Sequence, residues 1–283
     1  MSDSDFPEAD AHYRDAAYYD HAYRRYKPDV TFYVELAVGS GGPMLELGVG
    51  TGRVALAVAK AGIELVGVDK MTSMLERARR RLDRAPRRLR ERVSLVEGDL
   101  RDVRLERRFP FVAAPFNVFQ HLYTRRDVER ALATCAAHLT PNGRLAFAVL
   151  MPDPISLARD PHRYYKSRPV RHPRDGQRYA YDEAFDYDAE RQVQTTTMRF
   201  SDLETGEACF SEKLPQRQFF PQELEALLHY NGFEVLRQDG GFEGEPIDAY
   251  CESQVVIARL RRRPAPEASL PRRRAAAGAA ALR

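Results

Sequence analysis

The sequence predicts an α/β fold in which a parallel sheet has helices on both faces and carries an inserted antiparallel β-meander. Up to residue 150, short apolar runs alternate with segments whose apolar residues recur at helical spacing. This alternation is typical of parallel strands that are connected by helices. From about residue 179 to residue 220, polar and apolar side chains alternate along three consecutive segments, as they do in antiparallel strands.

The individual elements follow from local patterns. Apolar faces at helical spacing predict two short helices split near Pro28. Five strands are expected at "PMLELG", "IELVGVD", "VSLVEGD", "FPFVAAP" and "RLAFAVL", with helices at 51–61, 71–84 and 124–139. Thr124 and Asp127 form a variant of the capping box at the start of the third helix, and "TPNG" after it is expected to be a turn. Residues 151–178 are expected to be a long loop, and "PQELEALLHYNG", "FEVLRQDG" and "SQVVIARL" supply a last helix and two last strands.

Composition limits the classes of function. The 44 basic and 41 acidic residues leave a net charge of +3, which is a weak electrostatic basis for nucleic-acid binding. The three cysteines lie far apart, so we expect a reduced, cytoplasmic protein without a metal site. The start "MSDSDFPEAD" lacks the apolar core of a secretory signal, and no apolar run is long enough for a membrane span.

Three glycines follow the first expected strand in "ELGVGTG", at positions 48, 50 and 52. A turn of this kind between a strand and a helix brings backbone N–H groups close to a ligand. A dinucleotide-binding turn would have its third glycine where Arg53 stands, and the Lys-Ser/Thr pair of a P-loop is absent. Asp69 and Asp99 end the second and third strands, where carboxylates can accept from a ribose and from an adenine. Glu46, before the turn, would repel a pyrophosphate but suit an ammonium group.

These motifs resemble those of the class I S-adenosylmethionine-dependent methyltransferases over about residues 15–260. The matching segments are "ELGVGTG", "VGVDKMTSMLERAR", "VEGDL" and "HLTPNGRLAF", followed by the last helix and two strands. The resemblance implies a Rossmann-like sheet of seven strands that ends in a reversed hairpin, with S-adenosylmethionine as the cofactor.

The resemblance also implies roles for single residues. Gly48, Gly50 and Thr51 would pass under the methionine part of the cofactor, and Glu46 would orient the turn or the amino group. Asp69 would hold the ribose. The other residues expected at the cofactor are Tyr33, Lys70, Met74, Asp99, Leu100 and Pro115. Three of these have alternative explanations, since Met74 can fill the core, Lys70 can be solvated and Asp99 can cap a turn.

The methyl acceptor is expected near "APFNVFQHLYT", after the fourth strand, where Asn117, Gln120 and His121 would face the methyl group. The Asn-Pro-Pro-Tyr signature of adenine and glutamine-amide methyltransferases is absent. "FQHL" and the helix containing Tyr19 and Tyr23 resemble segments of bacterial sugar-amine N-methyltransferases, although Gln120 stands where those enzymes have glycine. We expect His121 to take or orient the proton of the acceptor, and Tyr19 to close over the site; His121 packed against backbone is the alternative.

The sequence therefore predicts methyl transfer to a small molecule, most readily at an amine nitrogen. The alternatives are an oxygen acceptor, an RNA methyltransferase favoured by the arginine-rich run 77–92, and a cofactor-binding partner protein without catalysis. The expected regions are a helical lid at 1–40, the cofactor-binding core at 41–150, an antiparallel insert at 151–220, the sheet completion at 221–260 and a disordered tail at 261–283. The insert would cover the acceptor or form a homodimer contact.

Overall fold

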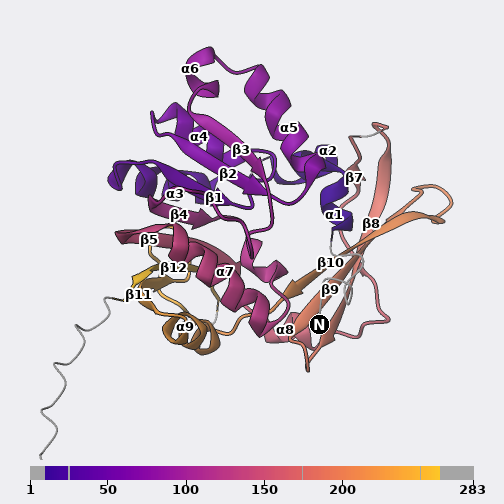
Figure 1. Cartoon of the computed structure of the whole chain (residues 1–283). Helices are drawn as coiled ribbons and strands as arrows, with labels where there is room; N and C mark the ends of the chain where they lie inside the picture. Colours follow the sequence, from indigo (N-terminus) through magenta and orange to yellow (C-terminus); the bar gives the residue numbers. More distant parts are fainter. Residues whose placement is uncertain (1–9, 25, 174, 249, 262–283) are drawn as a thin grey trace, which may run out of the picture.

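A computed structural model describes residues 10–24, 26–173, 175–248 and 250–261 of the chain. The expected tail, apart from Arg261, and the first nine residues of the expected lid lie outside the described residues. Figure 1 shows a central sheet between helices and a second sheet beside it, with the N-terminal helices where the two sheets meet. The α/β fold class with an added antiparallel meander is confirmed.

The central sheet has seven strands in the order β11-β12-β5-β4-β1-β2-β3. Strands β1 to β5 pair in parallel, whereas β12 is antiparallel to both β5 and β11. This is the expected reversed hairpin. The strands are β1 (Met44–Leu47), β2 (Leu65–Asp69), β3 (Val93–Glu97), β4 (Phe109–Ala114), β5 (Leu139–Leu150), β11 (Phe233–Asp239) and β12 (Ser253–Leu260).

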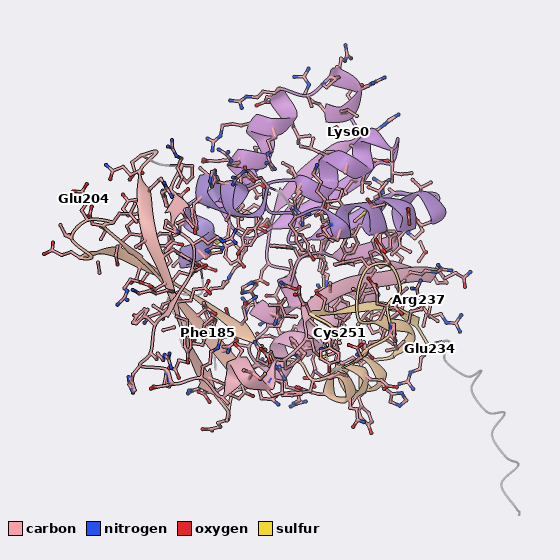
Figure 2. The ribbon with its side chains drawn as sticks, turned by 180° about the vertical axis from the view of Figure 1, so that it is seen from behind. Lys60, Phe185, Glu204, Glu234, Arg237 and Cys251 are labelled. Atoms are coloured by element: carbon pink, nitrogen blue, oxygen red, sulfur yellow. The ribbon has the colours of Figure 1, made fainter. Side chains whose placement is uncertain are left out.

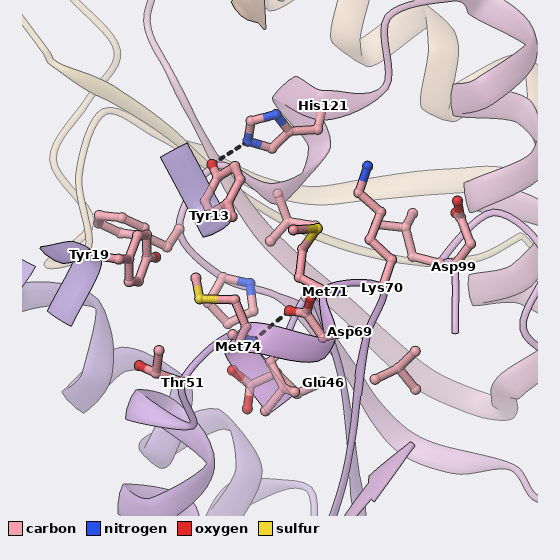
Figure 3. Close-up of a pocket in the computed structure, with 18 of the residues that line it drawn as sticks. Tyr13, Tyr19, Glu46, Thr51, Asp69, Lys70, Met71, Met74, Asp99 and His121 are labelled. Carbon is pink, nitrogen blue, oxygen red and sulfur yellow. Dashed lines mark hydrogen bonds between the residues drawn. The ribbon is translucent and has the colours of Figure 1, made fainter. Parts of the chain in front are cut away.

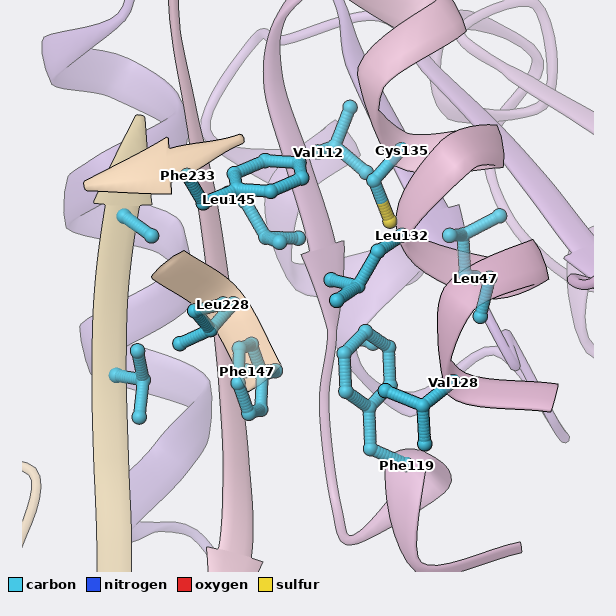
Figure 4. Packing of buried hydrophobic residues seen from close by; sticks show 14 of the residues in the cluster. Leu47, Val112, Phe119, Val128, Leu132, Cys135, Leu145, Phe147, Leu228 and Phe233 are labelled. Atoms are coloured by element: carbon cyan, nitrogen blue, oxygen red, sulfur yellow. The ribbon is translucent and has the colours of Figure 1, made fainter. Parts of the chain in front are cut away.

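Helices cover both faces of this sheet because their apolar stripes pack on it. On one face, α7 (Arg125–His138) and α9 (Pro221–Tyr230) bury Val128, Leu132 and Leu228 beside the strand residues Val112 and Phe147 (Figure 4). On the other face lie α3 (Pro28–Gly39), α4 (Arg53–Lys60), α5 (Thr72–Asp83) and α6 (Arg87–Arg90). No helix among the described residues is both long and apolar enough to cross a membrane.

Several boundaries differ from the sequence-based expectation. The helix α4 begins at Arg53 rather than at residue 51, because the glycine turn runs on to Gly52 with positive φ. Strand β5 begins at Leu139, so the expected "TPNG" turn lies inside it as an irregularity; Phe109 pairs with Leu139 and Phe111 with Arg144. The expected long loop at 151–178 contains α8 (Pro154–Leu157) and the short strands β6 (Tyr165–Lys166) and β7 (Val170–Arg171).

The capping box at α7 is present as expected. The Thr124 hydroxyl accepts from the Asp127 backbone N–H at 3.0 Å, and the Asp127 carboxylate accepts from the Thr124 backbone N–H at 3.1 Å. We expect Thr124→Ala to lower the free energy of unfolding by about 1 kcal/mol, as measured by urea denaturation. The control is Ser211→Ala on an exposed strand position, and an equal loss in both variants would contradict the capping role.

The first two helices, α1 (Ala11–Arg14) and α2 (Ala16–Tyr23), form a segment that we call the lid. Asp15 caps α2 by accepting from the backbone N–H of Ala17 and Tyr18. Asp20 ties α2 to the core because it pairs with Arg77 and Arg81 of α5. Two arginines of the run 77–92 thus hold the lid. These two residues have a structural role that does not involve RNA binding.

The second sheet contains β8 (Arg178–Asp188), β9 (Val193–Ser201) and β10 (Ala208–Arg217), with β6 paired at the edge in the order β10-β9-β8-β6. Tyr18 of the lid packs on this meander, edge-on to Phe200 and stacked on His172 at 4.8 Å between ring centroids. Figure 2 shows Glu204, at the turn between β9 and β10, on the opposite side of the molecule from Glu234 and Arg237 of β11. The meander therefore extends the molecule away from the reversed hairpin.

Candidate functional site

A cavity lies where β1, β2, β3 and β4 end, and the lid forms one of its walls (Figure 3). The space between atoms, including the open mouth, measures about 940 Å³. Of the thirteen residues expected to bind the cofactor or to take part in catalysis, twelve line the cavity, namely Tyr19, Glu46, Gly48, Gly50, Thr51, Asp69, Lys70, Met74, Asp99, Leu100, Pro115 and His121.

The glycine turn forms the floor of this cavity. Gly48 and Gly50 have φ values of 73° and 54°, which favour glycine, and a Cβ at Gly48 would overlap the Val118 side chain. The Gly50 N–H donates to Asp69 Oδ2 at 2.7 Å, and the Met71 N–H donates to Asp69 Oδ1 at 2.9 Å. Burial raises the pKa of Asp69, and these two hydrogen bonds oppose that rise. Asp69 thus joins the glycine turn to the end of β2.

Thr51 connects the turn to the lid. Its hydroxyl donates to Asp20 Oδ1 at 2.6 Å and accepts from Arg81 at 2.9 Å. The Thr51 side chain is buried, so its place in the cavity wall is fixed by α2 and α5 together.

Glu46 lies next to the glycine turn and has a carboxylate oxygen without a hydrogen-bond partner among the described residues. Glu46 is 2% exposed, and the oxygen without a partner is Oε2. Arg53 lies nearby, but its guanidinium makes two hydrogen bonds of 2.6 Å to the buried Asp29. Burial, with added repulsion from Asp29 and Asp69, raises the pKa of Glu46 well above its usual range despite the opposing charge of Arg53. A cationic ligand group would satisfy this carboxylate.

Tyr33 was expected at the cofactor, but the structure does not bring it to the cavity. It is fully buried on the core-facing side of α3, where its ring packs against Phe32 and Phe242. Burial raises the pKa of its hydroxyl well above the usual value, with contributions from Asp29 and Glu46. The expectation that Tyr33 closes over a ligand does not agree with this placement, because α3 turns that face toward the sheet.

Asp99 and Lys70 lie at the other end of the cavity. The Asp99 carboxylate is held by Arg101, whose Nε and Nη2 donate to it at 2.9 and 2.5 Å. Burial acts to raise the pKa of Asp99, but the bonds from Arg101 outweigh it and the pKa is lowered. Lys70 pairs at 2.7 Å with Asp10, which directly precedes the lid. Met74 is buried beside them, and both Asp99 and Lys70 remain partly exposed.

A tyrosine–histidine pair lies in the cavity wall, where the lid meets the segment that follows β4. The Tyr13 hydroxyl of the lid lies 2.6 Å from His121 Nε2, and His121 Nδ1 lies 3.3 Å from the Tyr123 hydroxyl (Figure 3 shows the first contact). The Tyr123 hydroxyl donates to the Pro215 carbonyl at 3.2 Å. A hydroxyl has one proton, so Tyr123 accepts from His121 Nδ1–H, and Nε2 accepts from Tyr13.

His121 is neutral in this arrangement. Burial and the positive charge of Lys70 lower its pKa to about 4. Burial also raises the pKa of Tyr13 well above its usual value, so both groups keep their neutral forms across the physiological range. The pair therefore offers an uncharged, oriented hydroxyl to the cavity.

The aromatic surroundings of the pair come from the lid and the turn after β4. Tyr19 lies 5.8 Å from Tyr13, 4.8 Å from Tyr23 and 6.2 Å from Phe116, measured between ring centroids. Burial raises the pKa of Tyr19 as well. Tyr19 and Phe116 thus give the wall an apolar, π-rich surface that suits a cationic ligand group.

Gln120 does not face the cavity, contrary to the expectation from its place beside His121. Its amide is fully buried, donates to the Arg217 carbonyl at 3.0 Å and accepts from the Leu150 backbone N–H at 3.2 Å. Asn117 takes a positive φ of 62° in the turn before the short helix η2 (Val118–His121) and is not part of the cavity wall described above. Gln120 instead links the central sheet to β10.

Three further residues line the cavity although no sequence motif predicted them, namely Tyr13, Arg53 and Tyr123. Arg53 directly follows the glycine motif, so its position was visible although its partner Asp29 was not. Tyr13 lies six residues before Tyr19 in a segment rich in tyrosine, and nothing in that pattern distinguishes the tyrosine that faces the cavity from those that pack on the meander.

Known proteins share both a domain and the fold with this chain. Residues 44–143 match the family profile described as a methyltransferase domain. The fold superposes on the CcbJ methyltransferase of Streptomyces caelestis with a TM-score of 0.72 and 24% identity, over 83% of this chain and 91% of that one. Residues 44–143 thus form a methyltransferase domain, and the chain has the fold of the class I S-adenosylmethionine-dependent methyltransferases.

Two curated relatives place this methyltransferase near enzymes named for nitrogen acceptors. It is 28% identical to the cypemycin N-terminal methyltransferase of a Streptomyces species, over 77% of this chain and 82% of that protein. It is 30% identical to the dTDP-3-amino-3,4,6-trideoxy-alpha-D-glucopyranose N,N-dimethyltransferase of Streptomyces venezuelae, but over only 41% of this chain and 45% of that protein.

The residues of the cavity fit the cofactor of the family. The unpartnered Oε2 of Glu46 suits its ammonium group. The carboxylates of Asp69 and Asp99 keep lone pairs for hydroxyl and amino donors, since each oxygen can accept more than one hydrogen bond.

Proposed function

We propose that this methyltransferase transfers a methyl group to an amine nitrogen of a small molecule or peptide, with Tyr13 and His121 facing the acceptor. The observation that carries the proposal is the 2.6 Å contact between the Tyr13 hydroxyl and His121 Nε2 at the cavity wall. In this assignment the residues hold the cofactor as the resemblance implies, with Asp69 at the ribose, Asp99 and Leu100 at the adenine edge, and Lys70 and Met74 beside the ring. Gly48, Gly50, Thr51, Pro115 and Glu46 surround the methionine part.

The bound cofactor supplies an electrophilic methyl group, and the protein supplies alignment. An amine attacks only in its neutral form. Since Tyr13 donates its own proton to His121, its oxygen keeps lone pairs for an N–H of the acceptor. Holding the acceptor in line can lower the barrier by several kcal/mol, of the order of 7 or more in well-oriented systems.

The low basicity of His121 favours an amine over a hydroxyl acceptor. With a pKa of about 4, His121 is too weak a base to remove a proton from an alcohol, whereas a neutral amine needs no such removal before it attacks. The peptide N-terminus is a second candidate acceptor, because the relative named for it matches over most of both chains.

The test is methyl transfer from isotopically labelled S-adenosylmethionine to paired acceptors, followed by mass spectrometry. Each pair has one compound with a free amine and a counterpart with a hydroxyl in its place, drawn from nucleotide-linked sugars and from short peptides. We expect label in amines alone. Transfer to the hydroxyl counterparts, or to RNA in preference to both sets, would overturn the proposal.

The protonation of Glu46 predicts how cofactor binding depends on pH. Because burial raises the pKa of Glu46, the free protein keeps a proton there up to a higher pH than an ordinary carboxyl group does, and an ammonium ligand favours the carboxylate. Binding of S-adenosylhomocysteine then releases this proton, so affinity rises as pH rises toward the pKa of Glu46 and levels off above it.

Calorimetry in two buffers of different ionisation enthalpy measures this proton release. Glu46→Gln should remove it and flatten the pH profile, whereas Glu64→Gln, an exposed carboxyl paired with Arg107, should leave both unchanged. Equal proton release by the Glu46→Gln variant and the unaltered protein would refute the assignment.

A further inference from the structure

Two tyrosine–histidine pairs lie next to each other between the lid and the meander. Beside Tyr13 and His121, the Tyr23 hydroxyl lies 3.2 Å from His12 Nε2. His12 is 2% exposed and does not reach the cavity. Four tyrosine rings surround it, with centroids at 5.4 to 6.1 Å, namely Tyr13, Tyr18, Tyr19 and Tyr23. The mechanism above gives this buried histidine no role.

The other ring nitrogen of His12 is held by the meander. His12 Nδ1 lies 3.4 Å from Oε2 of Glu212, on strand β10. An ionised carboxylate only accepts, so Nδ1 donates to Glu212. The Tyr23 hydroxyl can then donate to Nε2, so a neutral His12 repeats the polarity of the His121 pair.

Strand β10 also holds the pair formed by Tyr13 and His121. The Pro215 carbonyl of β10 accepts from Tyr123, which in turn accepts from His121 Nδ1–H. Two residues further along, the Arg217 carbonyl accepts from Gln120, the neighbour of His121. Strand β10 therefore contacts the lid histidine through the Glu212 side chain, and its backbone is linked to the η2 histidine through Tyr123.

We propose that His12 is a positioning residue for methyl transfer. Held by Glu212, it fixes the lid so that the Tyr13 hydroxyl stays on His121. In this arrangement β10 aligns two groups that come from separate parts of the chain, the lid and η2. In this proposal the insert aligns the reacting groups. The inference rests on the proposed role of Tyr13 and His121.

Because the acceptor is unidentified, the main test uses no acceptor. Long-range 1H–15N spectra of the histidine-labelled full chain report which nitrogen of each ring carries the proton and whether the other accepts a hydrogen bond. The His121→Asn spectrum assigns the His121 signals. We expect His121 to be protonated at Nδ1, and Glu212→Ala and His12→Ala to move its Nε2 signal toward that of an imidazole without a hydrogen bond.

Two kinds of control separate positioning from general damage. Glu207→Ala removes an exposed carboxylate just before β10 and should leave the His121 signals unchanged. His12→Asn, which keeps a donor near Nδ1 for Glu212, should shift them less than His12→Ala. If Glu212→Ala does not fold, Glu212→Gln gives the same comparison, with a small shift expected. His121 signals that stay unchanged in the Glu212 and His12 variants would overturn the proposal.

Turnover provides an independent readout once an amine acceptor is found. His12→Ala should lower kcat about tenfold, equivalent to about 1.4 kcal/mol, but have little further effect in a Tyr13→Phe background. An equal loss in both backgrounds would show that His12 does not act through Tyr13. Failure of methyl transfer to every amine would refute the proposed function and leave the spectroscopic result as the separate test of positioning.

Discussion

Asp69→Ala is expected to weaken the binding of S-adenosylhomocysteine about 100-fold, measured by calorimetry. The carboxylate holds the Gly50 and Met71 N–H groups, and we assign it to the ribose hydroxyls. Hydrogen bonds to a charged group contribute about 1.5–3 kcal/mol each, and 100-fold corresponds to about 2.7 kcal/mol. The ribose contacts and the support of the glycine turn together thus need to contribute only as much as one or two such hydrogen bonds.

Asp69→Asn separates these two contributions. Its remaining oxygen can accept one of the two backbone N–H groups, so we expect a smaller loss than with alanine. Asp83→Ala, at an exposed position near the end of α5, is the control for removing a carboxylate. Unaltered affinity in Asp69→Ala, with thermal stability retained, would remove Asp69 from the cofactor site.

Tyr13→Phe is expected to lower kcat about 10- to 100-fold while the Kd for S-adenosylhomocysteine changes less than twofold. The substitution keeps the ring in the aromatic wall but removes the oxygen that faces the acceptor. A loss of this size corresponds to about 1.4–2.7 kcal/mol of transition-state stabilisation. The measurement is initial-rate kinetics with the amine acceptor at saturating cofactor.

The matched control for this prediction is Tyr230→Phe, which removes a hydroxyl from a largely exposed ring on α9. It should leave both kcat and Kd unchanged. His121→Phe should resemble Tyr13→Phe, because it removes the partner that orients the hydroxyl. Full turnover in Tyr13→Phe would show that the pair is only structural.

Much of the cavity wall could be predicted because its residues belong to short motifs at the ends of parallel strands. Such ends meet along one edge of the sheet. Glu46, Asp69 and Asp99 therefore lie close together without depending on contacts from other segments. The capping box at Thr124 was equally predictable, since its two partners lie within four residues.

The residues that could not be predicted depend on contacts between distant segments. Tyr33 and Tyr13 both lie in N-terminal helices, and only packing decides that one enters the core and the other the cavity. Gln120 is drawn away from the cavity by the Arg217 carbonyl, 97 positions later. No local pattern contains that information.

The direction of β12 has a practical consequence. Since β12 runs against β5, the chain leaves the sheet at Leu260 on the side where the parallel strands begin, remote from the edge that carries Asp69 and His121. Immobilising the enzyme through a peptide fused after Arg261 would leave the open mouth of the cavity facing the solution. A fusion ahead of Asp10, a residue of the cavity wall, would instead crowd the entrance.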